Sequence, residues 1–195
     1  MKKVIFVVLA LIVVVGMAQA ADVLWGIRAG LAAGRTNKNW EDPGYPYTEK
    51  HPRHGFAGGV TLEIPLGSKF SILGEVSYIQ KGQRYEGSAG ELILKFDYIQ
   101  WDALVKFHIS ENYDFVAGPG IGFLISASQE WNNESQNIEN NTHPIEFVIN
   151  CSVQRRLFGS AYAELGFSRG LNDVYKEGDF NFKHSAAALC VGFHL

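Results

Sequence analysis

The sequence predicts an all-β fold, an eight-stranded antiparallel up-and-down transmembrane β-barrel, on the basis of three observations. Apolar side chains alternate with small or polar ones along eight segments, and a period of two is typical of β-strands. The connections between the segments alternate long and short, as in a membrane barrel with turns on one side and loops on the other. The chain also opens with an export signal, and no later stretch holds eighteen consecutive apolar residues that could form a transmembrane helix.

The first twenty residues have the parts of a secretory signal peptide. Two lysines precede an apolar run, residues 4–17, and Ala18 and Ala20 flank a small-x-small cleavage site. We therefore expect residues 1–20 to be a cleaved signal peptide and residues 21–195 to form one β-barrel domain. A retained N-terminal anchor is the alternative, and the cleavage pattern argues against it.

The composition suits a β-rich chain with an apolar surface. Only 19% of the residues are charged, whereas 13% are aromatic and 21 are glycines, which excludes a disordered chain. A net charge of -3 offers no basic surface for nucleic acid, so we expect no nucleic-acid partner. Cys151 and Cys190 each lie in an apolar alternating segment, where cysteine acts as a small hydrophobe, and we expect them to be unpaired.

The first four strand-like segments each have one apolar face and one small or polar face. In the fourth segment the alternation of apolar residues changes phase near Phe96 and Tyr98, which predicts a β-bulge there. The segments and their apolar residues are 23–35 (Trp25, Ile27, Ala29, Leu31, Ala33), 55–66 (Phe56, Val60, Leu62, Ile64), 69–82 (Phe70, Ile72, Val76, Tyr78) and 91–109 (Ile99, Trp101, Ala103, Val105, Phe107).

The last four segments repeat this pattern. They are residues 113–128 (Phe115, Ile121, Phe123, Ile125), 143–156 (Ile145, Phe147, Ile149, Val153), 160–169 (Ala161, Ala163, Leu165, Phe167) and 180–195 (Leu189, Val191, Phe193, Leu195). The long connections between the eight segments are residues 36–54, 83–90, 129–142 and 170–179, and the short ones lie near residues 67–68, 110–112 and 157–159.

The apolar face of the barrel is expected to point outward into lipid. The opposite face carries mostly glycine, alanine, serine and asparagine with isolated charges of both signs, which fits the narrow interior of an eight-stranded barrel. A solvated outer surface would hold many more lysines and glutamates. A soluble lipocalin-like barrel, which would bury the apolar face around a ligand, is the alternative.

Isolated charges on the inner face must pair, because an unpaired buried charge is costly. We expect Arg28, Glu63 and Glu75 to form a polar cluster between the first three strands, together with Glu164. This cluster is expected to be a structural plug that fills the lumen, and the alternative is a polar conduit for ions or small solutes. The charges assigned to the lumen are Arg28, Glu63, Glu75, Lys81, Asp102, Lys106, Glu146 and Glu164.

No set of residues marks out an active site, so we expect no catalytic residues, cofactor or metal. A G-x-S-x-G nucleophile motif is missing from the sequence. His184 and Ser185 are adjacent, so their side chains should point to opposite faces of a strand. His51 and His54 lie in an expected loop without a third metal ligand marked out by spacing.

Several segments resemble the PorT-like outer-membrane β-barrel domain family. They are GIRAGL at residues 26–31, GEVSYIQKG at 74–82, YIQWDALVKF at 98–107, AGPGIG at 117–122 and AELGFSRGL at 163–171. The resemblance spans nearly all of the expected barrel and implies an eight-stranded barrel in the outer membrane of Gram-negative bacteria. One branch of the family is linked to protein secretion, and the resemblance implies no catalytic residue.

This sequence departs from the family pattern at two places. Trp101 and Asp102 stand where the family usually has a more apolar pair with proline, and His194 and Leu195 end the chain where an aromatic residue is common. The second departure concerns the signal that the assembly machinery reads, not the fold.

Together these observations predict a monomeric protein of the cell outer membrane that contacts outer-membrane lipid and is inserted by the barrel-assembly machinery. Its expected role is structural, or that of a surface-interaction or secretion-accessory protein acting through its long loops. Two alternatives remain open: an enzyme that modifies outer-membrane lipid and the soluble ligand-binding barrel.

Overall fold

The computed structural model describes residues 23–37, 47–88, 90–132, 134–176 and 182–195. The expected signal peptide, residues 1–20, lies outside the described residues, as do residues 38–46 of the first long connection and residues 177–179 of the last. Within the described ranges the chain forms nine strands and one short 3-10 helix: β1 (Leu24–Thr36), β2 (Tyr47–Pro65), β3 (Phe70–Gly87), β4 (Gly90–His108), β5 (Tyr113–Trp131), β6 (Glu134–Asn137), η1 (Glu139–Asn141), β7 (Ile145–Arg156), β8 (Ala161–Gly170) and β9 (His184–His194).

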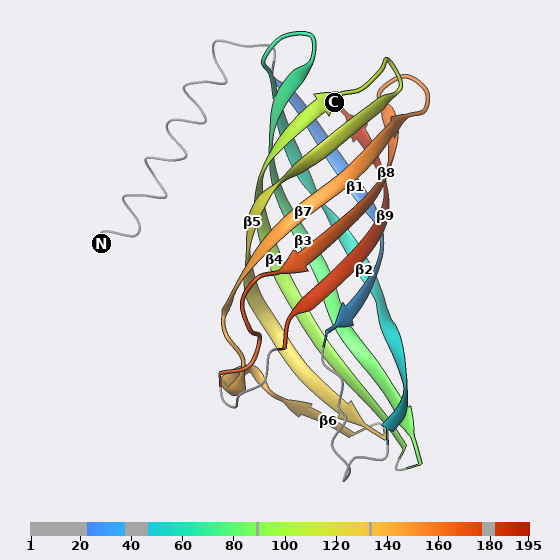
Figure 1. Cartoon of the computed structure of the whole chain (residues 1–195), viewed down its shortest axis with the longest axis vertical. Coiled ribbons are helices and arrows are strands. Elements are labelled where there is room, and N and C mark those ends of the chain that lie inside the picture. The colour runs from blue at the N-terminus through green and yellow to red at the C-terminus, as the bar shows by residue number, and fades with distance from the viewer. Residues whose placement is uncertain (1–22, 38–46, 89, 133, 177–181) are drawn as a thin grey trace, which may run out of the picture.

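Eight of the described strands form a closed antiparallel ring, which confirms the predicted fold (Figure 1). Each strand pairs with the next along the chain, with β5 followed in the ring by β7, and β9 pairs back on β1. Strand β6 pairs with β5 in an outer hairpin. Closure gives every strand of the ring a hydrogen-bonded partner on both sides. A strand in lipid needs both partners, because no water is available to bond its backbone N–H and C=O groups.

The short turns and the long connections lie at opposite ends of the barrel. The β2–β3, β4–β5 and β7–β8 turns lie at the end where β1 begins and the chain terminates, at the top of Figure 1. The β3–β4 hairpin, strand β6 and the helix η1 lie at the other end, which we call the outer end. None of the described helices is long and apolar enough to cross a bilayer.

The strands are of two lengths, and this corrects three of the expected boundaries. Strands β2 to β5 have 18 or 19 residues, whereas β1, β7, β8 and β9 have 10 to 13. A tilted strand crosses a bilayer with about 9–11 residues, so β2 to β5 project beyond the others at the outer end. The expected loops at residues 36–54, 83–90 and 129–142 are therefore partly strand. Alternation fails as a guide there because neither face of a projecting hairpin meets lipid.

The two faces of the barrel are as predicted. Leu31 is 75% exposed and Leu165 and Leu189 are each 63% exposed, whereas Lys81 and Lys106 are buried. A soluble ligand-binding barrel would show the reverse, and an exposed apolar surface this large marks a membrane contact. The apolar belt includes Trp25, Ile27 and Leu31 of β1, Val60 of β2, Phe70 and Val76 of β3, Trp101 and Val105 of β4, Phe115 and Phe123 of β5, Phe147 and Val153 of β7, Leu165 and Phe167 of β8, and Leu189 and Phe193 of β9.

The predicted bulge lies in the neighbouring strand. Alternate residues of β4 stay buried from Leu94 to Lys106 without a change of phase. The register shift falls between the pairs Asp97–Ser126 and Tyr98–Leu124, so β5 contains the extra residue and Ser126 is exposed rather than inward. What changes near Phe96 is the chemistry of the inner face, which turns from polar to apolar toward the outer end.

Candidate functional site

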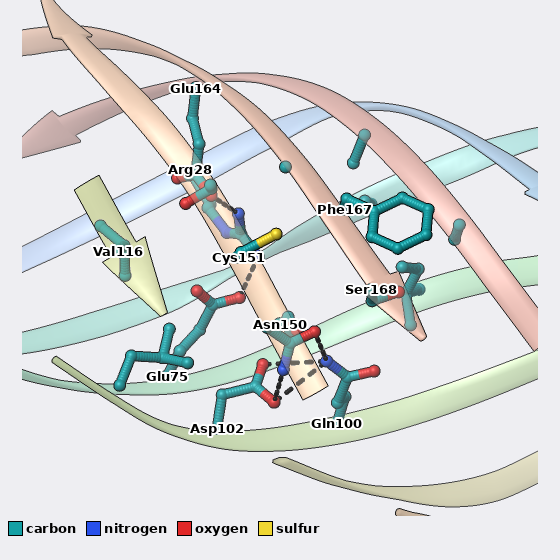
Figure 2. A pocket seen from close by; sticks show the side chains of 18 residues that line it. Arg28, Glu75, Gln100, Asp102, Val116, Asn150, Cys151, Glu164, Phe167 and Ser168 are labelled. Carbon is teal, nitrogen blue, oxygen red and sulfur yellow. Dashed lines mark hydrogen bonds and ion pairs between the residues drawn. The ribbon is translucent and has the colours of Figure 1, made fainter. Parts of the chain in front are cut away.

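The centre of the lumen is organised around Arg28, which extends inward from β1. Its guanidinium contacts Glu75 of β3 through Nη2 and lies 2.6 Å from Glu164 Oε1 of β8 through Nη1. Figure 2 shows the arginine between the two carboxylates. The three side chains are at most 14% exposed, so these charge-assisted hydrogen bonds operate largely out of water.

Glu63, the fourth residue of the expected cluster, lies elsewhere. Arg28 pairs across the sheet with Gly59, and Glu63 is four residues further along β2 toward the turns, a distance of about 13 Å along the strand. Its carboxylate contacts Lys106 Nζ instead. The cluster therefore has three members rather than four, because alternation assigns a residue to a face but leaves its height in the barrel undefined.

A second polar layer surrounds Asp102, on the outer side of Arg28. Gln100 Nε2 donates to both carboxylate oxygens of Asp102 at 3.0 Å, and Asn150 Nδ2 donates to Oδ1 at 2.8 Å. Figure 2 shows this group beside the Arg28 cluster. Because Asp102 is held by amides, the layer ties β4 to β7 without a second cation in direct contact.

A third layer contains the most deeply buried charges of the lumen. Lys81 Nζ lies 2.8 Å from Glu146 Oε2 and donates to Gln100 Oε1 at 3.2 Å. His184 Nδ1 lies 3.4 Å from the other Glu146 oxygen. The centroid of the His184 ring lies 4.6 Å from that of the Phe96 ring. This layer is therefore the boundary between the polar lumen and an apolar zone nearer the outer end.

The space left among these layers is small. A cavity of about 50 Å³ is lined by residues that include Arg28, Glu75, Asp102, Asn150 and Glu164. One water molecule needs about 15 Å³ of cavity volume, so the cavity has room for a few waters between the charged side chains.

An apolar plug fills the outer end of the barrel, and sequence reasoning missed it. Ile138, Val174 and Phe182 come from the outer connections and pack against Leu94 and Phe96 of β4, each 7% exposed or less. Ile138 and Val174 lie in the expected connections 129–142 and 170–179, whereas Phe182 lies in the expected strand segment 180–195. These single apolar residues were the available signal, but isolated apolar residues have no period to interpret.

The plug is fixed by backbone hydrogen bonds between the connections. Val174 N donates to Phe182 O at 2.9 Å, and His143 N donates to Val174 O at 2.6 Å. Tyr175 bridges to Thr142 and stacks edge-on against Phe182. Burial raises the pKa of Tyr175 to about 12, so its phenol adds no charge to the plug at neutral pH.

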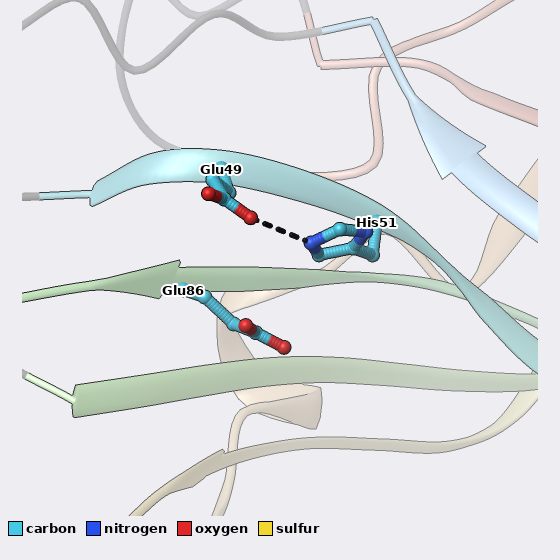
Figure 3. Close-up of side chains that lie close together, drawn as sticks. All are labelled: Glu49, His51 and Glu86. Carbon is cyan, nitrogen blue, oxygen red and sulfur yellow. Dashed lines mark hydrogen bonds and ion pairs between the residues drawn. The ribbon is translucent and has the colours of Figure 1, made fainter.

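Three groups at the outer tip of β2 and β3 could hold a metal ion. One ligand atom from each of Glu49, His51 and Glu86 lies within 4.8 Å of the others (Figure 3). His51 Nε2 is 3.3 Å from Glu49, while Glu86 is 2.8 Å from Arg84 Nε. Spacing alone marks out no third ligand, because His51 was assigned to a loop. The pairing of β2 with β3 places Glu49 opposite Glu86.

Two pairs of side chains considered in the sequence are not brought together in the structure. His184 is fully buried in the lumen, whereas the adjacent Ser185 is half-buried on the outer face, as strand alternation requires. Cys151 is exposed on the outer face of β7 and Cys190 is buried in the lumen, so the barrel wall separates the two thiols.

Residues 17–176 match the family model described as Outer membrane protein beta-barrel domain. The chain belongs to this family. It is therefore an outer-membrane β-barrel protein, located in the outer membrane and in contact with its lipid. The match is to this family and does not show the PorT-like family in particular. No curated protein matches the chain.

Solved structures show the same fold. Ail, the attachment invasion locus protein of Yersinia pestis, is 16% identical with a TM-score of 0.53, over 88% of this chain and 98% of that chain. The Neisserial surface protein A is 13% identical with a TM-score of 0.57, over 87% of this chain and 96% of that chain. At these identities the likeness concerns the fold alone.

Proposed function

We propose that this family member is a filled, non-conducting barrel whose β2 to β5 strands project outside the cell as a rigid sheet, here called the β-wall. This β-wall would interact with a surface partner. The observation that carries the proposal is the projection of β2 to β5 at the outer end, where each strand has 18 or 19 residues. Stiff hairpins offer a binding surface at a lower entropic cost than loops that must be ordered on contact.

The wall is braced by ion pairs within and between its strands. Arg53 of β2 lies 3.3 Å from Asp97 of β4, on the far side of β3, and Lys95 of β4 contacts Glu130 of β5. Arg84 of β3 bridges Glu86 of the same strand and Glu91 of β4. Cross-strand pairs of opposite charge stabilise a sheet by a few tenths of a kcal/mol up to about 1 kcal/mol each. A network of them favours a wall that keeps one shape above the membrane.

The contents of the lumen argue against a conduit. A solute would have to separate Lys81 from Glu146 and displace the plug residue Phe182. Breaking a buried ion pair costs about 3–5 kcal/mol. We infer that Arg28, Glu75 and Glu164, together with the Glu63–Lys106 pair, have a structural role.

Relatives by fold support a surface role. One is named for attachment and invasion, and a structure of it holds the heparin analogue sucrose octasulfate, with a TM-score of 0.51 to this chain. Because one fold can serve many functions, the partner of this chain is not inferred from that ligand.

We further infer that the protein is a monomer without enzymatic activity. It is inserted by the barrel-assembly machinery after cleavage of residues 1–20. The closed ring supports a monomer, because it leaves no strand edge for a second copy. A secretion-accessory role, as in one branch of the PorT-like family, rests on the short segments that resemble that family. Hydrolysis of labelled outer-membrane lipid by the purified protein would identify the enzyme alternative instead.

Two measurements test the proposed function. Planar-bilayer recording of the purified protein is expected to show no steady conductance. An Arg84→Cys variant in intact cells is expected to react with a membrane-impermeant maleimide, and the wild type, whose thiols face lipid and lumen, serves as the control. Steady conductance would assign a pore, and labelling only after lysis would place the wall inside the cell.

A further inference from the structure

Three cations gather on the outer face of β1, β8 and β9 at the outer end. Arg35 of β1 and Arg169 of β8 both pair across the sheet with Ser185 of β9, one from each side. Lys183 is two residues before Ser185, and its hydrogen bonds with Asn37 continue the β1–β9 ladder. Alternation along this ladder places Lys183 on the same face as Ser185.

Among the described residues, no carboxylate forms an ion pair with any of these three cations. The contrast is with the long-strand side, where Arg53, Arg84 and Lys95 each have an acidic partner. Arg35 and Arg169 are exposed, and Lys183 and Ser185 are half-buried. Like charges this close repel one another, and a bound anion would remove the repulsion.

The three cations lie at the edge of the apolar belt. On β8, Phe167 lies on the same face as Arg169 and two residues nearer the membrane, and it is 47% exposed. Leu165 follows it on that face. On β9, Ala187 and Leu189 follow Ser185 in the same way. Two residues of a strand span about 7 Å, so the cations stand one step above the hydrocarbon, at the level of the lipid headgroups.

The spacing suits one phosphate group. Two ladder steps separate Arg35 from Arg169, about 10 Å between their backbones, and arginine side chains can bridge that gap from both sides. A guanidinium group can donate two parallel hydrogen bonds to two oxygens of a phosphate, and a lysine adds a positive point charge. The Ser185 hydroxyl between the arginines can donate a further hydrogen bond.

We propose that Arg35, Arg169 and Lys183 surround Ser185 as a binding site for the phosphate group of a lipid in the outer leaflet. The apolar belt below them, with Phe167, Leu165 and Leu189, would contact the acyl chains of the same lipid. The site depends on the membrane placement of the barrel and is independent of what the β-wall binds.

Native mass spectrometry of the purified protein in a neutral detergent tests the site. The probes are lipid A, an acylated disaccharide with two phosphates, its dephosphorylated form and inorganic phosphate. We expect the wild type to retain lipid A and an Arg35→Gln/Arg169→Gln variant to bind it at least tenfold more weakly. An Arg84→Gln/Lys95→Gln variant, which loses the same charge from paired cations, should bind as the wild type does.

Each contrary outcome overturns a specific part of the proposal. Equal binding by the Arg35→Gln/Arg169→Gln variant removes the site, and an equal loss in the control variant shows attraction by net charge alone. Equal binding of dephosphorylated lipid removes the phosphate contact. Displacement of lipid A by micromolar inorganic phosphate would assign a site for the free anion instead. All variants should first show the heat-dependent gel shift of a folded barrel.

Discussion

Lys81 and Glu146 form an ion pair, 2.8 Å between Nζ and Oε2, whose two side chains are only 1% and 2% exposed. The pair joins β3 to β7 across the lumen. It lies next to the apolar plug, on the side that faces the centre of the barrel. Gln100 and His184 complete its surroundings. A buried pair of this kind constrains the strands it joins, since neither charge can be left alone in the interior.

Removing one partner of this pair should destabilise the barrel strongly. We expect Lys81→Met to lower the free energy of unfolding by about 3–5 kcal/mol, because the Glu146 carboxylate is left buried without its cation. The double variant Lys81→Met/Glu146→Gln should recover much of that loss. Urea unfolding in detergent micelles, followed by tryptophan fluorescence, measures both.

The matched control for that series is Lys95→Met. Its pair with Glu130 is on the outer wall, where the lysine side chain is 36% exposed. An exposed pair contributes about 0–1 kcal/mol, so this variant should unfold nearly as the wild type does. Equal losses for Lys81→Met and Lys95→Met would show that the lumen pair is no more important than a surface contact.

The lumen also shows how far the sequence could predict this protein. Alternation identified the inner face of all eight strands, so Arg28, Glu75 and Lys81 could be assigned to the lumen without a structure. The partner of each charge could not be predicted, because partners depend on the stagger between strands. Glu63 pairs with Lys106 for this reason.

The outer end was least predictable for a different reason. Strand β2 begins at Tyr47, inside an expected loop, because hairpins above the membrane lack the apolar face that reveals a strand in lipid. The plug is built from Ile138, Val174 and Phe182, single residues far apart in the chain. Only the closed ring brings them to one place.

Phe182 should control how often the outer plug opens. Its side chain is 1% exposed and packs against Tyr175 and His184. Truncating a buried phenylalanine costs about 3–5 kcal/mol, so in Phe182→Ala the amides of residues 171–176 should exchange with solvent roughly 100-fold faster or more. Hydrogen exchange with mass spectrometry measures this directly.

Phe158→Ala is the control for the plug variant. Phe158 is 78% exposed at the opposite end of the barrel, in the β7–β8 turn. We expect it to leave exchange in residues 171–176 unchanged. If Phe182→Ala also left that exchange unchanged, the plug would not be held by apolar packing.

Metal binding at the outer tip should be limited by Arg84. This arginine pairs with Glu86, one of the three groups that could hold an ion with Glu49 and His51. The Arg84→Gln variant frees Glu86 from an exposed ion pair that contributes about 1 kcal/mol and competes with the metal ion for the carboxylate. The affinity for Zn²⁺ should therefore rise about fivefold. Competition with a zinc-sensitive dye measures it. Adding His51→Ala should abolish the gain, and a gain that survives would place the ion elsewhere.

Gly30 should be indispensable at the seam where β9 closes on β1. A Cβ built at this glycine would lie 2.6 Å from Cys190 Cα and closer still to Leu189 O, both of them backbone atoms of β9. Backbone at this distance cannot yield without separating the two strands, so Gly30→Ala should break the ladder that closes the ring and abolish the heat-dependent gel shift. Gly74→Ala is the matched control, because a Cβ there meets nothing nearer than Leu62 O at 3.9 Å. It should fold as the wild type does, with one more methyl group in lipid. A normal gel shift for Gly30→Ala would mean that the seam tolerates a wider spacing than the β1–β9 register implies.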